Sequence, residues 1–174
     1  MLSDEKKMFE ETALPHFDAA YNLARWLTRD DHAAEDVVQE SFARAARYFH
    51  SFRGGSAKAW LLGVVRRASL DWLAKRQAQA AEPLDDVVAE RDDRAADPVY
   101  LVIRKCDRET VRAALDELPP PLREAIVLRE LEGMSYQEIA AVAEVPIGTV
   151  MSRISRARQR LQRRLAAYGE DNVP

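Results

Sequence analysis

Six arginines gather in residues 147–165, near the C-terminal end of the chain, and the same stretch holds no acidic residue. At the helical period of 3.6 residues, most of these arginines lie opposite one apolar stripe. The stripe consists of Val150, Ile154, Ala157, Leu161 and Leu165. Because the whole chain carries a formal charge of −3, this segregated positive charge predicts a polyanionic partner, most simply DNA.

The residues just before this basic helix complete a helix–turn–helix. Ser135 and Glu138 form an S-x-x-E pattern, which is typical of a capping box at a helix start. Pro146 ends that short helix and is suited to open the next one. A solvated basic helix or a coiled-coil surface is the alternative. The succession of short helix, tight turn and basic helix favours DNA binding.

Other chemistry has little support in the sequence. The histidines His16, His32 and His50, taken with the single cysteine Cys106, lack metal-ligand spacing. No Ser/His/Asp set, phosphate-binding loop or paired carboxylates stand out. We therefore expect no metal, no cofactor and no enzymatic activity. One cysteine excludes an intramolecular disulfide and fits a reducing cytoplasm. No secretory signal or membrane-spanning run is evident, so we expect a cytoplasmic protein without membrane insertion.

Helical spacing of apolar residues dominates the chain, and no strand-like alternation is convincing, so the expected fold class is all-α. Besides the C-terminal pair, the pattern predicts helices over about residues 15–28, 31–49, 56–79, 98–118 and 122–132. Asp30-Asp31 and Ser56 are suited to cap two of them. The acids in the first turns of the 31–49 helix suit either its dipole or a docking surface.

Charge divides the chain into domains. Residues 53–76 contain six basic side chains and one acid, which predicts a second basic surface. Residues 80–98 contain seven acids and two arginines, with prolines at both ends, and indicate a flexible, extended linker. The predicted organisation is a helical domain over 1–80, an acidic linker over 81–97, a helix–turn–helix domain over 98–168 and a flexible tail over 169–174.

Four segments, in this order, resemble signatures of bacterial sigma-70 factors, most closely the extracytoplasmic-function (ECF) group. They are DVVQESF at 36–42, AWLLGVVRRASLDWL at 59–73, the stretch from Leu118 to EGMSYQEIA at 132–140, and VPIGTVMSR at 145–153. They resemble region 2.2, regions 2.3 and 2.4, the start of region 4 and its recognition helix. The likeness spans roughly residues 10–166, which implies two small helical domains joined by the linker.

The resemblance implies a sigma factor that binds core RNA polymerase through the β′ clamp helices and the β flap. The residues implied to bind polymerase are Asp36, Val37, Gln39, Glu40 and Phe42. Those implied to meet the −10 element are Arg53, Lys58, Trp60, Arg66, Arg67, Asp71, Lys75 and Arg76. Those implied for the −35 element are Thr149, Ser152, Arg153, Ser155, Arg156, Arg158 and Arg160. The resemblance also implies an anti-sigma factor as a partner and places the linker in the RNA channel of the polymerase.

Three positions depart from the pattern of that family. Glu144 stands in the turn where glycine is usual, and a left-handed backbone there costs a non-glycine residue about 1 kcal/mol. Met151 stands where Lys or Arg is frequent, and Arg67 where asparagine is common. These departures leave the promoter sequence open, while the general role stays as implied.

Leu62, Leu70 and Leu73 lie on the outer side of the 56–79 helix. Either another helix of the same domain covers them or an anti-sigma factor does. We expect the two domains of the free chain to be loosely coupled through the linker, so that an inhibitor would compact them.

Two other functions fit parts of the sequence. A stand-alone helix–turn–helix regulator would use residues 1–80 for sensing or dimerisation. A protein-binding adaptor would use the same helices without DNA, and a steep loss of DNA affinity with rising salt would argue against it.

Overall fold

The computed structural model describes residues 3–79 and 108–171, and every regular element in these ranges is helical. The expected all-α fold is therefore confirmed for the described chain. The linker predicted over 81–97, the first part of the 98–118 helix, and Cys106 lie outside the described residues.

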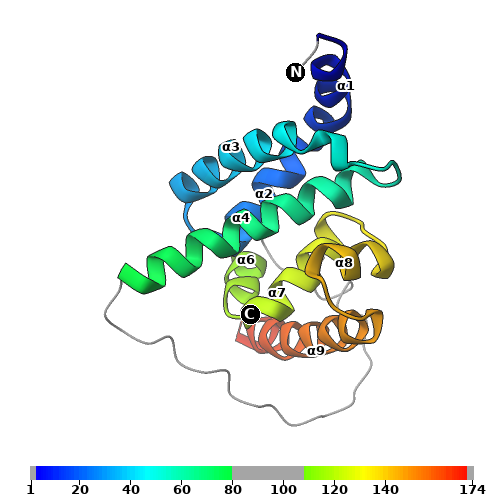
Figure 1. Cartoon of the computed structure of the whole chain (residues 1–174). Helices are drawn as coiled ribbons and strands as arrows, with labels where there is room; N and C mark the ends of the chain where they lie inside the picture. The colour runs from blue at the N-terminus through cyan, green and yellow to red at the C-terminus, as the bar shows by residue number, and fades with distance from the viewer. Residues whose placement is uncertain (1–2, 80–107, 172–174) are drawn as a thin grey trace.

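The N-terminal domain (residues 3–79) is a set of packed helices (Figure 1). Its helices are α1 (Ser3–Ala13), η1 (Leu14–His16), α2 (Phe17–Thr28), α3 (Asp31–Arg47), η2 (Phe49–Ser51) and α4 (Ala57–Gln79). The predicted caps are confirmed, since Asp30 Oδ1 accepts from the Ala33 amide at 2.9 Å and Ser56 Oγ from the Ala59 amide at 3.1 Å. Helix α1 was not predicted from the sequence, and only Phe9 and Ala13 of it are buried.

The C-terminal domain (described over residues 108–171) contains the helix–turn–helix. Its elements are α6 (Arg108–Asp116), α7 (Pro120–Ile126), η3 (Val127–Leu131), α8 (Tyr136–Ala143) and α9 (Ile147–Asp171). The helix expected over 122–132 becomes a π-helical turn at η3 before Gly133, whose φ is +63°. The predicted cap is confirmed: Ser135 Oγ accepts from the Glu138 amide at 3.1 Å.

Helix α4 lies between the two domains (Figure 1). On one side it packs against α2 and α3, and on the other against α8. Buried apolar side chains of both domains form one continuous core. This arrangement differs from the loose coupling expected from the sequence, because the C-terminal domain supplies an apolar partner for the outer side of α4.

The outer leucines of α4 show the effect of this packing. Leu62 is fully buried, Leu73 is half-buried, and Leu70 remains 40% exposed. Packing within the described chain therefore covers Leu62 completely, Leu73 partly and Leu70 least. Within the described ranges, no helix is both long and apolar enough to cross a bilayer.

Candidate nucleic-acid interface

Helix α9 presents the arginine-rich surface predicted from the sequence. The apolar stripe packs into the core, where Val150, Ile154, Ala157, Leu161 and Leu165 are each at most 1% exposed. This burial fixes the rotation of the helix, so the residues opposite the stripe face outward.

The turn before α9 keeps its left-handed conformation despite the glutamate. Glu144 has φ +56° and ψ +43° at the C-terminal end of α8. The amide of Val145 then donates to the carbonyl of Ala140 at 3.2 Å, and the amide of Thr149 to that of Pro146 at 3.0 Å. A non-glycine residue in this conformation carries a backbone strain of about 1 kcal/mol.

The residues predicted for the −35 element share α9 but differ in exposure. Ser152, Ser155 and Arg156 are exposed, whereas Thr149, Arg153, Arg158 and Arg160 are half-buried. The Ser152 hydroxyl donates to the carbonyl of Thr149 at 3.1 Å. Arg158 lies at the edge of the apolar stripe, where its Nη2 donates to Glu130 at 2.7 Å. The centre of the outward face is thus formed by Ser152, Arg156 and their neighbours.

The first part of the predicted −10 surface is the loop before α4. Arg53 is exposed there, beside Gly54 and Gly55, whose φ values are +86° and +85°. Trp60 is half-buried, and its ring centroid lies 6.0 Å from that of Phe49 and 5.3 Å from that of Phe52. Trp60, near the start of α4, therefore belongs to an aromatic cluster with Phe49 and Phe52.

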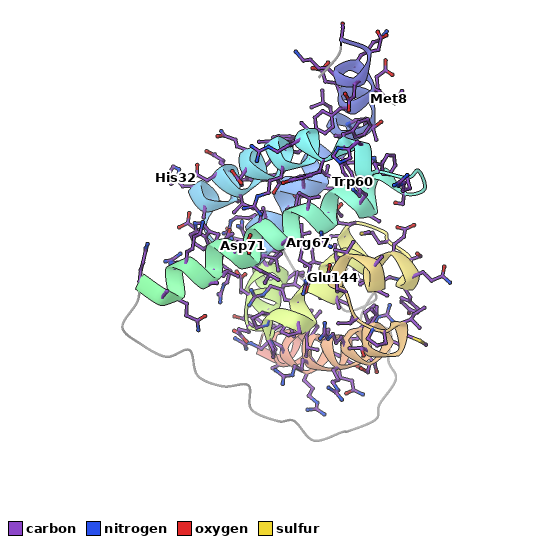
Figure 2. The ribbon with its side chains drawn as sticks, viewed as in Figure 1. Met8, His32, Trp60, Arg67, Asp71 and Glu144 are labelled. Carbon is purple, nitrogen blue, oxygen red and sulfur yellow. The ribbon has the colours of Figure 1, made fainter. Side chains whose placement is uncertain are left out.

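Three cations predicted for the −10 element pair with glutamates of the C-terminal domain. Lys58 Nζ lies 3.2 Å from Glu132 Oε2 and donates to the backbone carbonyl of the same residue at 2.7 Å. Arg66 pairs with Glu124, and both side chains are largely buried. Arg67 Nε donates to Glu144 Oε1 at 3.1 Å, and Arg67 and Glu144 face each other between α4 and α8 (Figure 2).

The remaining −10 candidates lie further along α4. Asp71 turns toward α3, where it accepts from Arg44 Nη1 at 2.9 Å. Arg76 lies 5.1 Å from the ring centroid of Trp72, and Lys75 is exposed. The predicted −10 set is therefore split between cations held by the C-terminal domain and cations open to solvent.

The predicted polymerase-binding face lies on α3. Asp36, Gln39 and Glu40 are exposed and point away from the core. Val37 is only 3% exposed, so its prediction as a contact residue needs correction: it anchors α3 to the core. Phe42 is half-buried, with its ring centroid 5.6 Å from that of Phe17.

Burial and ion pairing perturb the glutamates between the domains in opposite directions. Burial raises the pKa of Glu124, against the opposing effect of the nearby Arg66 and Arg153 guanidinium groups. Arg67 lowers the pKa of Glu144, which is exposed. Of the two arginines that act on Glu124, Arg66 belongs to α4 and Arg153 to α9.

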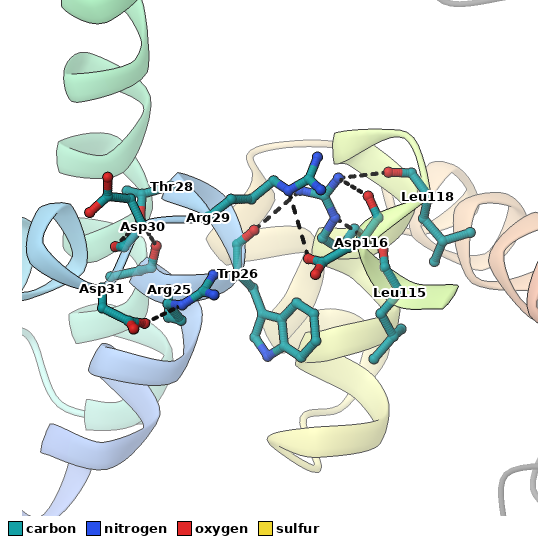
Figure 3. A network of polar contacts seen from close by, with 11 residues as sticks. Arg25, Trp26, Thr28, Arg29, Asp30, Asp31, Leu115, Asp116 and Leu118 are labelled. Carbon is teal, nitrogen blue, oxygen red and sulfur yellow. Dashed lines mark hydrogen bonds and ion pairs between the residues drawn. The ribbon is translucent and has the colours of Figure 1, made fainter. Parts of the chain in front are cut away.

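A buried arginine, not identified as functional from the sequence, joins the two domains. Figure 3 shows Trp26 of α2 close to Leu115, Asp116 and Leu118, the residues whose carbonyls this arginine bonds. Arg123 is 4% exposed and donates to the carbonyls of Leu115, Asp116 and Leu118 at 2.9–3.1 Å. Its Nη1 also donates to the carbonyl of Trp26 in α2 at 3.2 Å. Burial lowers the pKa of Arg123, with a smaller contribution from Arg29. The one signal for Arg123 in the sequence is that it lies in the stretch from Leu118 onward, which resembles the start of region 4.

In the part of the chain that the structure describes, no group of three or more His, Cys, Asp or Glu side chains is arranged to hold a metal ion. The chemistry available at the two surfaces is that of guanidinium, ammonium and hydroxyl groups, which bind phosphates and base edges.

Comparisons with known proteins match both domains. A family model described as Sigma-70 region 2 matches residues 14–79, and one described as Sigma-70, region 4 matches residues 108–161. The ECF RNA polymerase sigma factor SigE of Mycolicibacterium smegmatis is 37% identical over 169 residues, which cover 95% of this chain and 64% of that protein. The ECF RNA polymerase sigma-E factor of Escherichia coli K12 is 38% identical over 138 residues, covering 75% and 72%.

Two solved structures resemble the fold closely. The sigma factor RpoE from Bartonella quintana, in complex with the anti-sigma factor NepR, has a TM-score of 0.74 at 31% identity and covers 92% of this chain and 98% of that one. CnrH, in complex with the cytosolic domain of CnrY, has a TM-score of 0.65 at 27% identity and covers 93% and 90%.

Proposed function

Because the chain belongs to the ECF group of the sigma-70 family, we propose that it binds core RNA polymerase and directs initiation at promoters that carry matching −35 and −10 elements. The members of this family are transcription regulators. The chemistry of RNA synthesis then belongs to the polymerase, and this chain supplies promoter choice and strand separation in the cytoplasm.

The observation that carries the proposal is the outward face of α9. A helix–turn–helix places its second helix in the major groove, where side chains near the start of that helix reach base edges. In this chain those side chains are Ser152, Ser155 and the exposed Arg156, with Thr149 and Arg153 beside them. We assign base-edge and nearby phosphate contacts to Arg153 and Arg156, and phosphate contacts to Arg158 and Arg160.

The surface of α4 and its preceding loop is proposed to bind the −10 element. Its cations are Arg53, Lys58, Arg66, Arg67, Lys75 and Arg76. Trp60 supports the loop through its aromatic cluster, and Asp71 orients Arg44 on α3. A basic surface with a nearby aromatic side chain is typical of single-strand binding, which is the form of DNA at an opened −10 element.

The acidic face of α3 is proposed to dock on the polymerase. Asp36, Gln39 and Glu40 are exposed in successive turns of this helix, and Phe42 offers a partly exposed ring. Exposed charges at a docking surface act mainly on the rate and specificity of association. Val37 contributes indirectly, because its buried side chain fixes the face of α3 that points outward.

Control by an anti-sigma factor is the second part of the proposal. The similar sigma factor RpoE is seen with the anti-sigma factor NepR, and the similar protein CnrH is seen with the cytosolic domain of CnrY. They support an inhibitor for this chain but leave its identity to experiment.

The test is in vitro transcription with core polymerase and genomic DNA fragments. We expect transcripts that start at defined sites only when this protein is added, together with co-purification of the protein and the core enzyme. A protein that binds promoter fragments but never associates with polymerase would be a stand-alone regulator, and the proposal would be wrong.

A further inference from the structure

Two large apolar side chains lie exposed at the start of α9, beside the polar residues proposed for the −35 element. Ile147 and Met151 are one turn apart on this helix and are 43% and 51% exposed. We call this pair the apolar flank of α9. The base and phosphate contacts assigned above to arginines give it no role. The following inference rests on the proposed binding of α9 to the −35 element.

The core does not take up Met151. Its neighbours Val150 and Ile154 are each 1% exposed, and their burial fixes the rotation of the helix. At 100° per residue, Met151 lies only about 40° from the exposed Ser155 around the helix axis. Met151 therefore borders the outward face and reaches solvent there.

The surface around Met151 is open to a close approach. The nearby Ser152 and Ser155 have short side chains, and Gly148, one turn before Ser152, has none. Beyond the chain neighbours of Gly148, no side chain lies within 4 Å of the position that a Cβ would take. Met151 is the longest of these four residues, so it would be the first of them to touch a partner.

Charge indicates the partner. Residues 147–165 hold six arginines and no acid, so the surface that contains the apolar flank attracts a polyanion. For α9 the proposed polyanion is the −35 duplex. The major groove of DNA presents one apolar group, the 5-methyl group of thymine, and apolar side chains recognise thymine by contact with it.

We propose that Met151, with Ile147 beside it, reads thymine in the −35 element through an apolar contact with the 5-methyl group. A lysine or arginine, which is frequent at position 151 in the family pattern, would instead bind guanine or a phosphate. The methionine replaces that charged contact with one that depends on a single methyl group. This chain then favours a T·A pair at a step of the −35 element where a charged side chain would favour G·C.

The test removes the methyl group alone. In a promoter fragment obtained from the transcription assay above, each thymine of the −35 element is replaced in turn by 2′-deoxyuridine, which pairs with adenine but lacks the 5-methyl group. Competition binding measures the affinity of the holoenzyme for each fragment. The holoenzyme carries the unmodified chain, Met151→Ala or Met8→Ala. Met8 is the matched control, because it is a 60% exposed methionine on α1.

With the unmodified chain and with Met8→Ala, we expect deoxyuridine to weaken binding about two- to fourfold at one position or more, the effect of one buried methyl group. With Met151→Ala, the thymine and deoxyuridine fragments should bind equally at those positions. Deoxyuridine without effect at every position would overturn the proposal. The same loss with Met151→Ala as with the unmodified chain would also overturn it.

A second variant separates the apolar contact from charge. Met151→Lys should lose the deoxyuridine effect and bind all duplexes more tightly at low salt, with a logarithmic salt dependence steeper by about one unit of slope. A deoxyuridine effect that survives in Met151→Lys would place the methyl contact on another residue and overturn the proposal. Absence of polymerase-dependent transcription would instead refute the proposed function, whereas intact transcription without any deoxyuridine effect would refute the methyl contact alone.

Discussion

Arg67 and Glu144, 77 residues apart in sequence, form an ion pair between α4 and the turn of the helix–turn–helix (Figure 2). Both are positions at which the chain departs from the sigma-70 pattern that it otherwise resembles. The two departures are therefore linked in the structure. Glu144 keeps the left-handed turn, and its side chain pairs with Arg67 of α4. A surface pair of this kind contributes at most about 1 kcal/mol, which is comparable to the backbone strain at Glu144.

Substitution at Glu144 separates the strain from the ion pair. Glu144→Gly removes both, and Glu144→Gln removes the charge while the strain stays. We expect the glycine variant to be more stable than the glutamine variant by about 1 kcal/mol in chemical denaturation, because glycine adopts φ +56° freely. Equal stabilities of the two variants would show that the turn relaxes without strain.

Much of the fold was accessible from local sequence signals. The caps at Asp30, Ser56 and Ser135 were predicted because each side chain acts on an amide three residues away. The buried stripe of α9 followed from helical period alone. Such signals are local, so they hold whatever the rest of the chain does.

The relations between distant segments were not accessible in the same way. Nothing in the periodicity of α4 shows that Leu62 is fully buried, or that Arg66 meets Glu124 across 58 residues of sequence. The resemblance grouped Val37 with its exposed neighbours on α3 as a polymerase contact, yet its side chain belongs to the core. The arginines predicted from spacing were located correctly on α4 and α9, while their pairing partners depend on tertiary packing.

Arg123 is expected to be the most sensitive polar residue for stability. Its guanidinium donates to four carbonyls, and its replacement removes all four hydrogen bonds at a largely buried site. We expect Arg123→Met to lower the free energy of unfolding by about 2–4 kcal/mol in urea denaturation. Arg29→Ala is the control, because the Arg29 side chain is 54% exposed and lies 3.7 Å from Asp116. If Arg123→Met loses no more stability than Arg29→Ala, the hydrogen bonds of Arg123 do not have the proposed role.

The faces of α3 should respond differently to substitution. Asp36→Lys reverses an exposed charge on the proposed polymerase face, so we expect about tenfold weaker binding to the core enzyme with little change in stability. Val37→Ala instead leaves a cavity in the core and should lower stability by about 1–3 kcal/mol. Surface plasmon resonance with immobilised core enzyme and thermal melting measure the two effects. Polymerase affinity unaffected by Asp36→Lys would place the docking face elsewhere.

His16 gives the stability a dependence on pH. Burial, and then the charge of Lys58, lower its pKa below 6.5, so the folded chain favours the neutral imidazole. Unfolded chains take up the proton first, and the contribution of His16 is therefore complete above pH 6.5 and declines as the pH falls through and below that value. We expect His16→Gln to lose less stability than the unmodified chain between about pH 7.5 and pH 5.5. Parallel pH profiles of the two proteins, from urea denaturation, would contradict the assignment.

The two arginines Arg156 and Arg158 test which face of α9 enters the DNA. Arg156 is exposed on the outward face, whereas Arg158 sits at the edge and donates to Glu130 at 2.7 Å. We expect Arg156→Ala to weaken binding of the holoenzyme to a duplex with the cognate −35 element by about 1–3 kcal/mol, and to relax discrimination against mutated elements. Arg158→Ala should weaken all duplexes alike and by less, because it removes at most a phosphate contact. Competition binding against mutated −35 duplexes measures both. The reverse order of effects would mean that α9 is rotated in the groove toward Arg158, and that the buried stripe does not fix the recognition face.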